Sequence, residues 1–103
     1  MNNVYDNILG LIGNTPMVKL NKVTNSIPAK VFAKLESCNP GHSTKDRIAL
    51  HIIEDAEQKG LLQPGSVIVE TTSGNTGFSV AMVSIVKGYD CVLAVSDKTK
   101  PEK

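Results

Sequence analysis

The chain has 103 residues, of which 41% are hydrophobic and 20% are charged, values that fit a single globular domain and argue against a disordered protein. Eleven basic residues against ten acidic ones leave a formal net charge of +1, and only 4% of the residues are aromatic. Such a chain has neither the positive surface nor the stacking side chains of a nucleic-acid-binding protein, so we expect no nucleic-acid partner.

The sequence also argues against export and against a place in the membrane. Its first residues lack the basic start and long apolar run of a signal peptide, and the longest strongly apolar stretch, residues 80–86, is too short to cross a bilayer. The cysteines are Cys38 and Cys91, which we expect to be free thiols of a cytoplasmic protein.

The first third of the chain reads as extended segments joined by turns. A turn is predicted at residues 13–16, followed by a short extended piece at 17–20 and a loop at 25–28. Residues 30–36 alternate between apolar and charged side chains, apart from Phe32 on the polar side, which predicts a half-buried strand.

A helix is expected after the loop at residues 38–42. Ser43 can cap its start, with Asp46 three residues later completing a capping box, while Lys59 suits its last turn and Gly60 its left-handed end. Four apolar residues at helical spacing predict the face that this helix turns to the core: Ala49, Ile52, Ile53 and Ala56.

The remaining pattern is strand, loop, helix and strand. Residues 66–70 predict a short buried strand, residues 71–77 a polar loop, the following residues up to Lys87 a helix that ends at Gly88, and residues 91–95 a second strand. This is a βαβ unit, so the predicted fold class is α/β with a parallel sheet and flanking helices.

Lys45 is the first candidate for chemistry. It stands in the first turn of a predicted helix, where the helix dipole is positive and a cation is unfavourable. A lysine that breaks this local rule is either functional or a surface side chain extending into water beside Asp46, and the residues alone leave both readings open.

The loop at residues 72–77 is the second candidate. It precedes a helix whose first N–H groups can bind a carboxylate or phosphate, and it follows the carboxyl end of a strand, where open α/β sheets bind ligands. The alternative is a helix start that is merely rich in capping residues.

Other motifs are absent. The glycine spacing of residues 60–66 has Ser66 where a phosphate-binding loop needs lysine, and no dinucleotide fingerprint follows a strand. The side chains of Cys38, His42, His51 and Glu54 match no standard metal spacing, so we expect no metal, and no nucleophilic triad is supported.

Residues 34–49 and 70–77 together resemble the fold-type II pyridoxal-phosphate enzymes, in particular the cysteine synthase and cystathionine β-synthase branch. Residues 12–20 look like the N-terminal signature of the same family, so the resemblance covers nearly the whole chain. It implies a fold like that of the tryptophan synthase β-subunit, pyridoxal 5'-phosphate as cofactor, and a homodimer of the full-length protein.

The resemblance also implies site residues. Lys45 matches the lysine that forms the internal Schiff base with the cofactor and later moves the α-proton. Asn75 matches the residue that hydrogen-bonds the hydroxyl of the pyridine ring. The loop residues that match the clasp on the substrate α-carboxylate are Thr72, Ser73, Asn75 and Thr76.

The chain departs from the family pattern near these positions. His42 and Thr44 replace a small and an aliphatic residue, Thr71 replaces a common proline, and Phe78 and Ser79 replace smaller residues, which leaves the substrate preference open. The family's phosphate-binding loop and its partner for the pyridine nitrogen lie beyond Lys103. We therefore expect residues 1–103 to be the N-terminal part of a longer enzyme domain.

The expected activity is β-replacement on serine or an O-activated serine, with a small amino acid and a thiol or sulfide as substrates. Cysteine synthase, which uses sulfide, is the leading reading, and cystathionine β-synthase, which joins serine and homocysteine, is the alternative. Serine and threonine dehydratases are less favoured because their loop usually differs from residues 73–77. A rival of another class is a truncated, non-catalytic module that keeps the fold and binds a partner.

Overall fold

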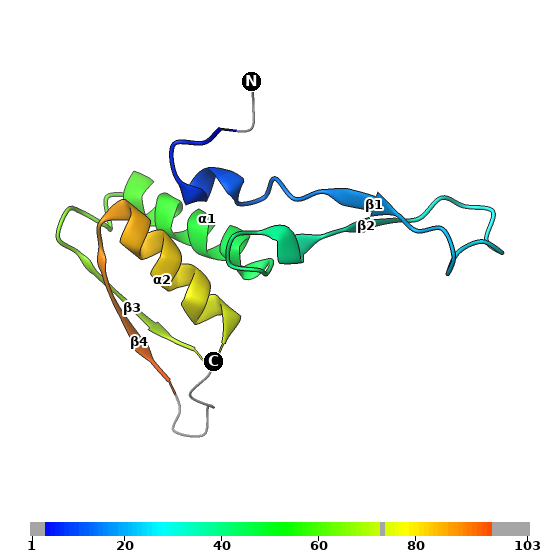
Figure 1. The fold of residues 1–103 in the computed structure, drawn as a ribbon. Coiled ribbons are helices and arrows are strands. Elements are labelled where there is room, and N and C mark those ends of the chain that lie inside the picture. The colour runs from blue at the N-terminus through cyan, green and yellow to red at the C-terminus, as the bar shows by residue number, and fades with distance from the viewer. Residues whose placement is uncertain (1–3, 73, 96–103) are drawn as a thin grey trace.

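The computed structural model describes residues 4–72 and 74–95 (Figure 1). Its elements in chain order are η1 (Ile8–Leu11), β1 (Met17–Lys19), β2 (Phe32–Lys34), η2 (Glu36–Cys38), α1 (Lys45–Gln58), β3 (Val67–Thr71), α2 (Asn75–Lys87) and β4 (Asp90–Ala94). None of the helices in these ranges is long and apolar enough to cross a membrane.

Strands β1 and β2 form an antiparallel hairpin that extends away from the rest of the chain (Figure 1). Val18 pairs with Ala33 at its centre. Phe32 is exposed whereas Ala33 is half-buried, which confirms the predicted burial pattern with Phe32 on the polar side. The predicted bounds of 30–36 were too wide, because β2 covers three residues and Glu36 already begins η2.

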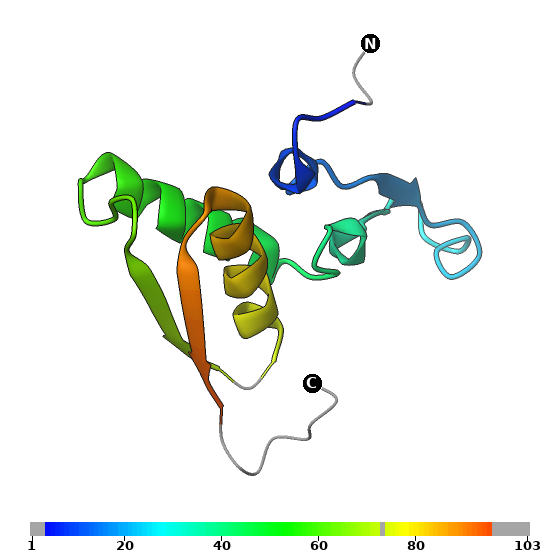
Figure 2. The same ribbon diagram turned by 60° about the vertical axis from the view of Figure 1, so that its left-hand side comes forward.

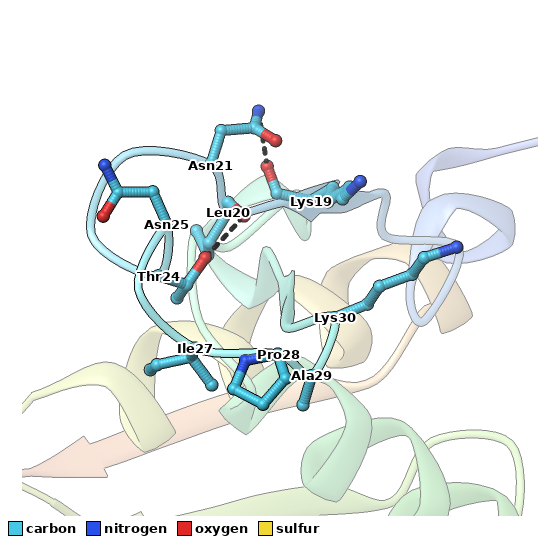
Figure 3. A pocket seen from close by; sticks show the side chains of 9 residues that line it. All are labelled: Lys19, Leu20, Asn21, Thr24, Asn25, Ile27, Pro28, Ala29 and Lys30. Carbon is cyan, nitrogen blue, oxygen red and sulfur yellow. Dashed lines mark hydrogen bonds between the residues drawn. The ribbon is translucent and has the colours of Figure 1, made fainter.

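The loop that joins the hairpin strands encloses an open hollow of about 250 Å³ (Figure 3). The Thr24 hydroxyl donates a hydrogen bond to the Leu20 carbonyl at 2.9 Å, so the loop is closed by its own residues. Most of the residues around the hollow are exposed.

Strands β3 and β4 pair in parallel, with Val69 opposite Val92, and α2 connects them. This confirms the predicted βαβ unit. Both long helices lie on the same side of this sheet (Figures 1 and 2). The buried core between the helices and the sheet consists of Ala49, Ile53, Val80 and Val83.

Glycine ends both long helices as predicted. Gly60, two residues after the end of α1, has φ +75°, and Gly88 caps α2 with φ +83°. Both angles lie in the left-handed region that residues with a Cβ rarely adopt. The predicted helix ends are therefore confirmed. After each glycine, the chain leaves the helix direction and leads to the next strand.

The predicted burial of two segments was wrong. Ile52 is 60% exposed although its neighbours Ala49 and Ile53 are buried, because only one side of α1 meets another element of the described chain. In β3, Val67 and Val69 are also exposed, since their side chains point away from the two helices. A parallel strand is usually covered on both faces, and here the described residues cover one.

Candidate functional site

Lys45 is the first residue of α1 and is partly exposed. The predicted capping box is wrong: the N-cap residue is Thr44, and its side chain makes no capping hydrogen bond. Instead, the hydroxyl oxygen of Ser43 accepts a hydrogen bond from the Lys45 N–H at 3.1 Å. The physical reason is that the Asp46 carboxyl group does not turn back to the start of its own helix.

Asp46 is completely buried and joins three parts of the chain. Its Oδ2 accepts a hydrogen bond from the Gly41 N–H at 2.5 Å, and its Oδ1 accepts one from the Ser79 hydroxyl, also at 2.5 Å. A Cβ on Gly41 would collide with this carboxyl group. The loop before α1, the first turn of α1 and the second turn of α2 are thus fixed to one another next to Lys45.

A second polar contact joins the helices at their other ends. Glu57, near the end of α1, accepts hydrogen bonds from the Lys87 ammonium at 2.9 Å and from the Tyr89 hydroxyl at 2.6 Å. The hydrogen bond from Lys87 is the main cause that lowers the pKa of Glu57 below its ordinary value. With Asp46 and Ser79 joined at one end and Glu57 and Lys87 at the other, α1 and α2 run in the same direction (Figure 1).

The polar loop after β3 lies at the same end of the helix pair as Lys45. Thr72 Oγ1 accepts hydrogen bonds from the N–H groups of Gly77 at 3.0 Å and of Gly74 at 3.2 Å. It therefore satisfies one of the N–H groups at the start of α2 that have no acceptor inside the helix. Gly77 is buried, and a Cβ there would collide with the Thr72 methyl group.

The other predicted residues of this loop follow at the start of α2. Asn75 is the first residue of that helix and is exposed, and Thr76 is half-buried. Their N–H groups, like those at any helix start, have no intrahelical acceptor and carry the positive end of the helix dipole. Ser73 lies outside the described residues. The structure thus brings Thr72, Asn75 and Thr76 to the end of the helix pair at which Lys45 begins α1.

A network that the sequence analysis did not predict surrounds Glu36. Arg47, two residues after Lys45, donates to both Glu36 oxygens, from Nε at 2.6 Å and from Nη2 at 2.9 Å. The Thr15 hydroxyl and the Asn39 amide donate to the same carboxylate. The hydrogen bond from Arg47 is the largest of the effects that lower the pKa of Glu36 from 4.5 to about 2.

Asn39 extends this network to the N-terminal turn. It is buried, accepts a hydrogen bond from the Gly13 N–H at 2.8 Å and donates to the Ser43 carbonyl at 3.0 Å. Arg47 also donates to the Gly13 carbonyl at 3.1 Å. Gly13, Glu36, Asn39 and Arg47 all lie inside the motifs that carry the resemblance, but their spacing alone gave no sign that they contact one another.

His42 has a backbone angle that is unusual for its residue type. Its φ is +65°, the one positive φ of a described residue other than glycine. A left-handed conformation costs a residue with a Cβ of the order of 1 kcal/mol. This strain gives a physical reason why glycine would suit position 42, three residues before Lys45.

The thiols and the remaining histidine stay apart from this arrangement. Cys38 and Cys91 are free, as predicted, and His51 is exposed on α1. Within residues 4–72 and 74–95, no three or more His, Cys, Asp and Glu side chains are grouped so that they could hold a metal ion.

Comparison with known proteins gives the same assignment as the motifs. The model of the family described as "Pyridoxal-phosphate dependent enzyme" matches residues 8–103. A cysteine synthase from a Flavobacterium strain is 52% identical over 99 residues, covering 96% of this chain and 32% of that protein. The cystathionine beta-synthase of Apis mellifera is 49% identical over 102 residues, covering 97% of this chain and 20% of that protein.

Solved structures share the fold at high similarity. A hydrogen sulfide-producing enzyme from Fusobacterium nucleatum has a TM-score of 0.90 and 44% identity, and the match covers 99% of this chain and 33% of that one. O-ureido-L-serine synthase has a TM-score of 0.84 and 45% identity over 96% of this chain and 31% of its own. The chain thus spans between a fifth and a third of these relatives. With nearly all of its residues matched in both sequence and fold, it belongs to the pyridoxal-phosphate dependent enzyme family, as a partial domain of fold type II.

Proposed function

We propose that residues 1–103 are the N-terminal part of a pyridoxal-phosphate-dependent catalytic domain that makes cysteine by β-replacement on an O-activated serine, with sulfide as the nucleophile. The observation that carries the proposal is the arrangement at the shared start of α1 and α2. There, Asp46 joins the helix that begins with Lys45 to the helix that begins with Asn75. An amine and an anion-binding helix start are the groups that this reaction requires on the protein side.

The residues at this end fit the cofactor that the family uses. Lys45 is partly exposed at the start of α1 and would supply the amine that bonds to the cofactor aldehyde. Asn75 is exposed at the start of α2 and would supply the amide for the hydroxyl of the pyridine ring. When bound, pyridoxal phosphate withdraws electrons from the α-carbon of the amino acid and so makes its proton easier to remove.

The loop after β3 is assigned to the substrate. We expect two kinds of donor to bind the α-carboxylate: the N–H groups at the start of α2, and the hydroxyl and amide groups of the loop. The helix dipole and the free N–H groups favour an anion at this place. The residues proposed for this role are Thr72, Ser73, Asn75 and Thr76. Thr72 also fixes the loop through its bonds to Gly74 and Gly77, which holds the donors in place before the substrate arrives.

Lys45 is proposed as the group that moves the proton. With the cofactor bound, the Lys45 amine would take the α-proton of the amino acid whose carboxylate the loop holds. The β-substituent would leave with its bonding electrons, sulfide would add to the β-carbon, and the Lys45 ammonium would return the proton to the α-carbon. The contacts of Asp46 limit how far the start of α1 can move from the loop during these steps.

A cystathionine β-synthase reaction, with serine and homocysteine, is the second candidate, because relatives of both names match this chain at nearly equal identity. The third candidate is a non-catalytic module that keeps the fold and binds a partner. For the full-length protein we propose a homodimer in the cytoplasm.

The test is an assay of the full-length protein that contains residues 1–103, with acetylserine plus sulfide and with serine plus homocysteine. We expect cysteine formation with the first pair and its loss in Lys45→Ala. Lys45→Arg should fail as well, because a guanidinium stays protonated and cannot form the bond to the cofactor. Lys59→Ala, at the opposite end of α1, is the matched control and should remain active.

Each outcome separates the candidates. Activity only with serine and homocysteine would favour the second candidate. A protein that binds no cofactor and turns over neither substrate pair would favour the non-catalytic module. If Lys45→Ala retained even about a tenth of the wild-type turnover, the role of this amine would be refuted, since loss of a covalent catalytic group costs far more.

A further inference from the structure

Ser79 and Asp46 form a fully buried pair, and neither residue is among those proposed above to contact the cofactor or the substrate. Both residues are 0% exposed, and they are 33 positions apart in the sequence. Their oxygens lie 2.5 Å apart, with the Ser79 hydroxyl donating. A serine in the middle of a helix more often bonds within its own helix, as Ser84 does with the Val80 carbonyl at 2.7 Å. Ser79 instead reaches across to α1.

The pair is part of a continuous series of contacts from Lys45 to the loop after β3. Asp46 is the covalent neighbour of Lys45 and also holds the Gly41 N–H. Ser79 lies two residues beyond Gly77, whose N–H is bonded to Thr72. Any shift of the first turn of α1 against the first turns of α2 has to break a buried hydrogen bond, which is costly because the separated groups find no water.

We propose that Ser79 and Asp46 are positioning residues, which set the place of the Lys45 amine relative to the substrate carboxylate bound by the Thr72 loop. The inference rests on the function proposed above. Proton transfer and bond formation depend steeply on distance, and a misplacement of about 1 Å can lower a rate about 100-fold. The buried pair restricts movement of the first turn of α1, which carries Lys45, against the first turns of α2, which follow the loop.

The role requires the hydroxyl of Ser79 rather than its volume. Ser79→Ala removes the donor and leaves Asp46 Oδ1 a buried acceptor without this partner. Asp46→Asn is milder in design, because its amide oxygen can still accept from Gly41 while its NH2 group donates to the Ser79 oxygen. Ser84→Ala is the matched control: it removes a buried hydroxyl from the same helix, but one that makes its bond within α2.

The test uses the full-length protein and two readouts. The first is the rate at which pyridoxal phosphate becomes fixed to Lys45 by borohydride, followed by peptide mapping. The second is kcat and KM for the amino-acid substrate. For Ser79→Ala we expect both the fixation rate and kcat to fall about tenfold, with KM changed less than twofold, because the carboxylate donors remain. Ser84→Ala should match the wild type in all three quantities, and Asp46→Asn should fall between Ser84→Ala and Ser79→Ala.

The outcomes distinguish this inference from the proposed function. Equal fixation rates and kcat in Ser79→Ala and Ser84→Ala would overturn the positioning role while leaving the role of Lys45 intact. A rise in KM with unchanged kcat in Ser79→Ala would also overturn it, because the pair would then serve binding of the carboxylate. If Lys45 were not modified in the wild type at all, the proposed function itself would fail. Should Ser79→Ala not fold, Asp46→Asn against Ser84→Ala repeats the comparison.

Discussion

The side chains around Glu36 show how a few hydrogen bonds hold the segment before Lys45. Arg47 binds Glu36 through two N–H groups, and Thr15 and Asn39 donate to the same carboxylate. A paired arginine and carboxylate in this two-point geometry has more directional restraint than a single surface ion pair. The carboxylate therefore ties the N-terminal turn, η2 and α1 together in its ionised form.

Acid should release this tie. The pKa of Glu36 is lowered from 4.5 to about 2 in the folded protein, chiefly by Arg47, so its stabilising contribution is complete above pH 4.5 and is lost as the pH falls towards 2. We expect the unfolding temperature of Glu36→Gln to lie below that of the wild type at pH 7, and the gap to close near pH 2. Thermal unfolding of the full-length protein at several pH values measures it.

Glu54→Gln provides the control for this pH profile. Glu54 is exposed on α1, the helix that carries Arg47, and its 3.6 Å ion pair with Lys87 lies towards the other end of that helix from Arg47. Its effect on the unfolding temperature should be small at every pH, as is usual for an exposed ion pair. A gap between the wild type and Glu36→Gln that stayed constant from pH 7 to pH 2 would show that Glu36 acts by packing rather than by charge.

The sequence predicted local features of single residues better than their distant contacts. Gly60 and Gly88 follow from a local rule, because a left-handed helix end requires a residue without a Cβ. The local capping rule failed for Asp46, because a buried hydrogen bond to Ser79 competes with the cap and wins. No pattern within one helix reveals a partner 33 residues away.

The junction of β3 and α2 depends on close contact between a loop and a helix. Gly77 lies in the first turn of α2, where its N–H bonds Thr72 Oγ1, and the Thr72 methyl group fills the place that a Cβ would take. Thr72 therefore serves as both the acceptor for the helix start and the wall against it. The loop proposed to hold the substrate is built on this contact.

Gly77→Ala should break the junction. In an ordinary helix, alanine is about 1 kcal/mol better than glycine, but here its Cβ overlaps Thr72, and overpacking typically costs about 1–3 kcal/mol. We expect a lower unfolding temperature for the full-length protein and weaker binding of the amino-acid substrate. Adding Thr72→Ser removes the methyl group but keeps the acceptor, so the double variant should recover part of the loss.

Gly74→Ala is the control for this pair, because a Cβ at Gly74 would meet nothing within 4 Å. It should leave stability nearly unchanged. If Gly77→Ala were as harmless as Gly74→Ala, or if Thr72→Ser gave no recovery, the contact between the Thr72 methyl group and Gly77 would not be what holds the loop.

The elements themselves were largely predictable. The strand, loop, helix and strand pattern predicted β3, α2 and β4, and the parallel direction of the two strands followed from the helix between them, although their register did not. Burial was not predictable, because Ile52 and Val69 carry side chains fit for a core that the described residues do not complete.

The arrangement of the whole chain explains this excess of exposed apolar surface. Both helices cover one face of the two-stranded sheet, and the opposite face bears Val67, Val69 and Val92, each more than half exposed. The buried core of the described residues has four members. A sheet that is bare on one face and carries unpaired edges favours association with other chains.

We therefore expect the isolated 103-residue chain to self-associate at micromolar concentration, which sedimentation velocity measures directly. Val69 and Val92 are paired across β3 and β4. The double variant Val69→Lys, Val92→Lys should shift the chain towards the monomer, because the variant carries two charges on the uncovered face of the sheet. Val23→Lys is the control, since Val23 is 79% exposed in the hairpin loop, away from the sheet. A monomeric wild-type chain would refute the expectation outright. If Val23→Lys reduced association as much as the two sheet substitutions, general hydrophobicity and not the uncovered sheet face would drive the association.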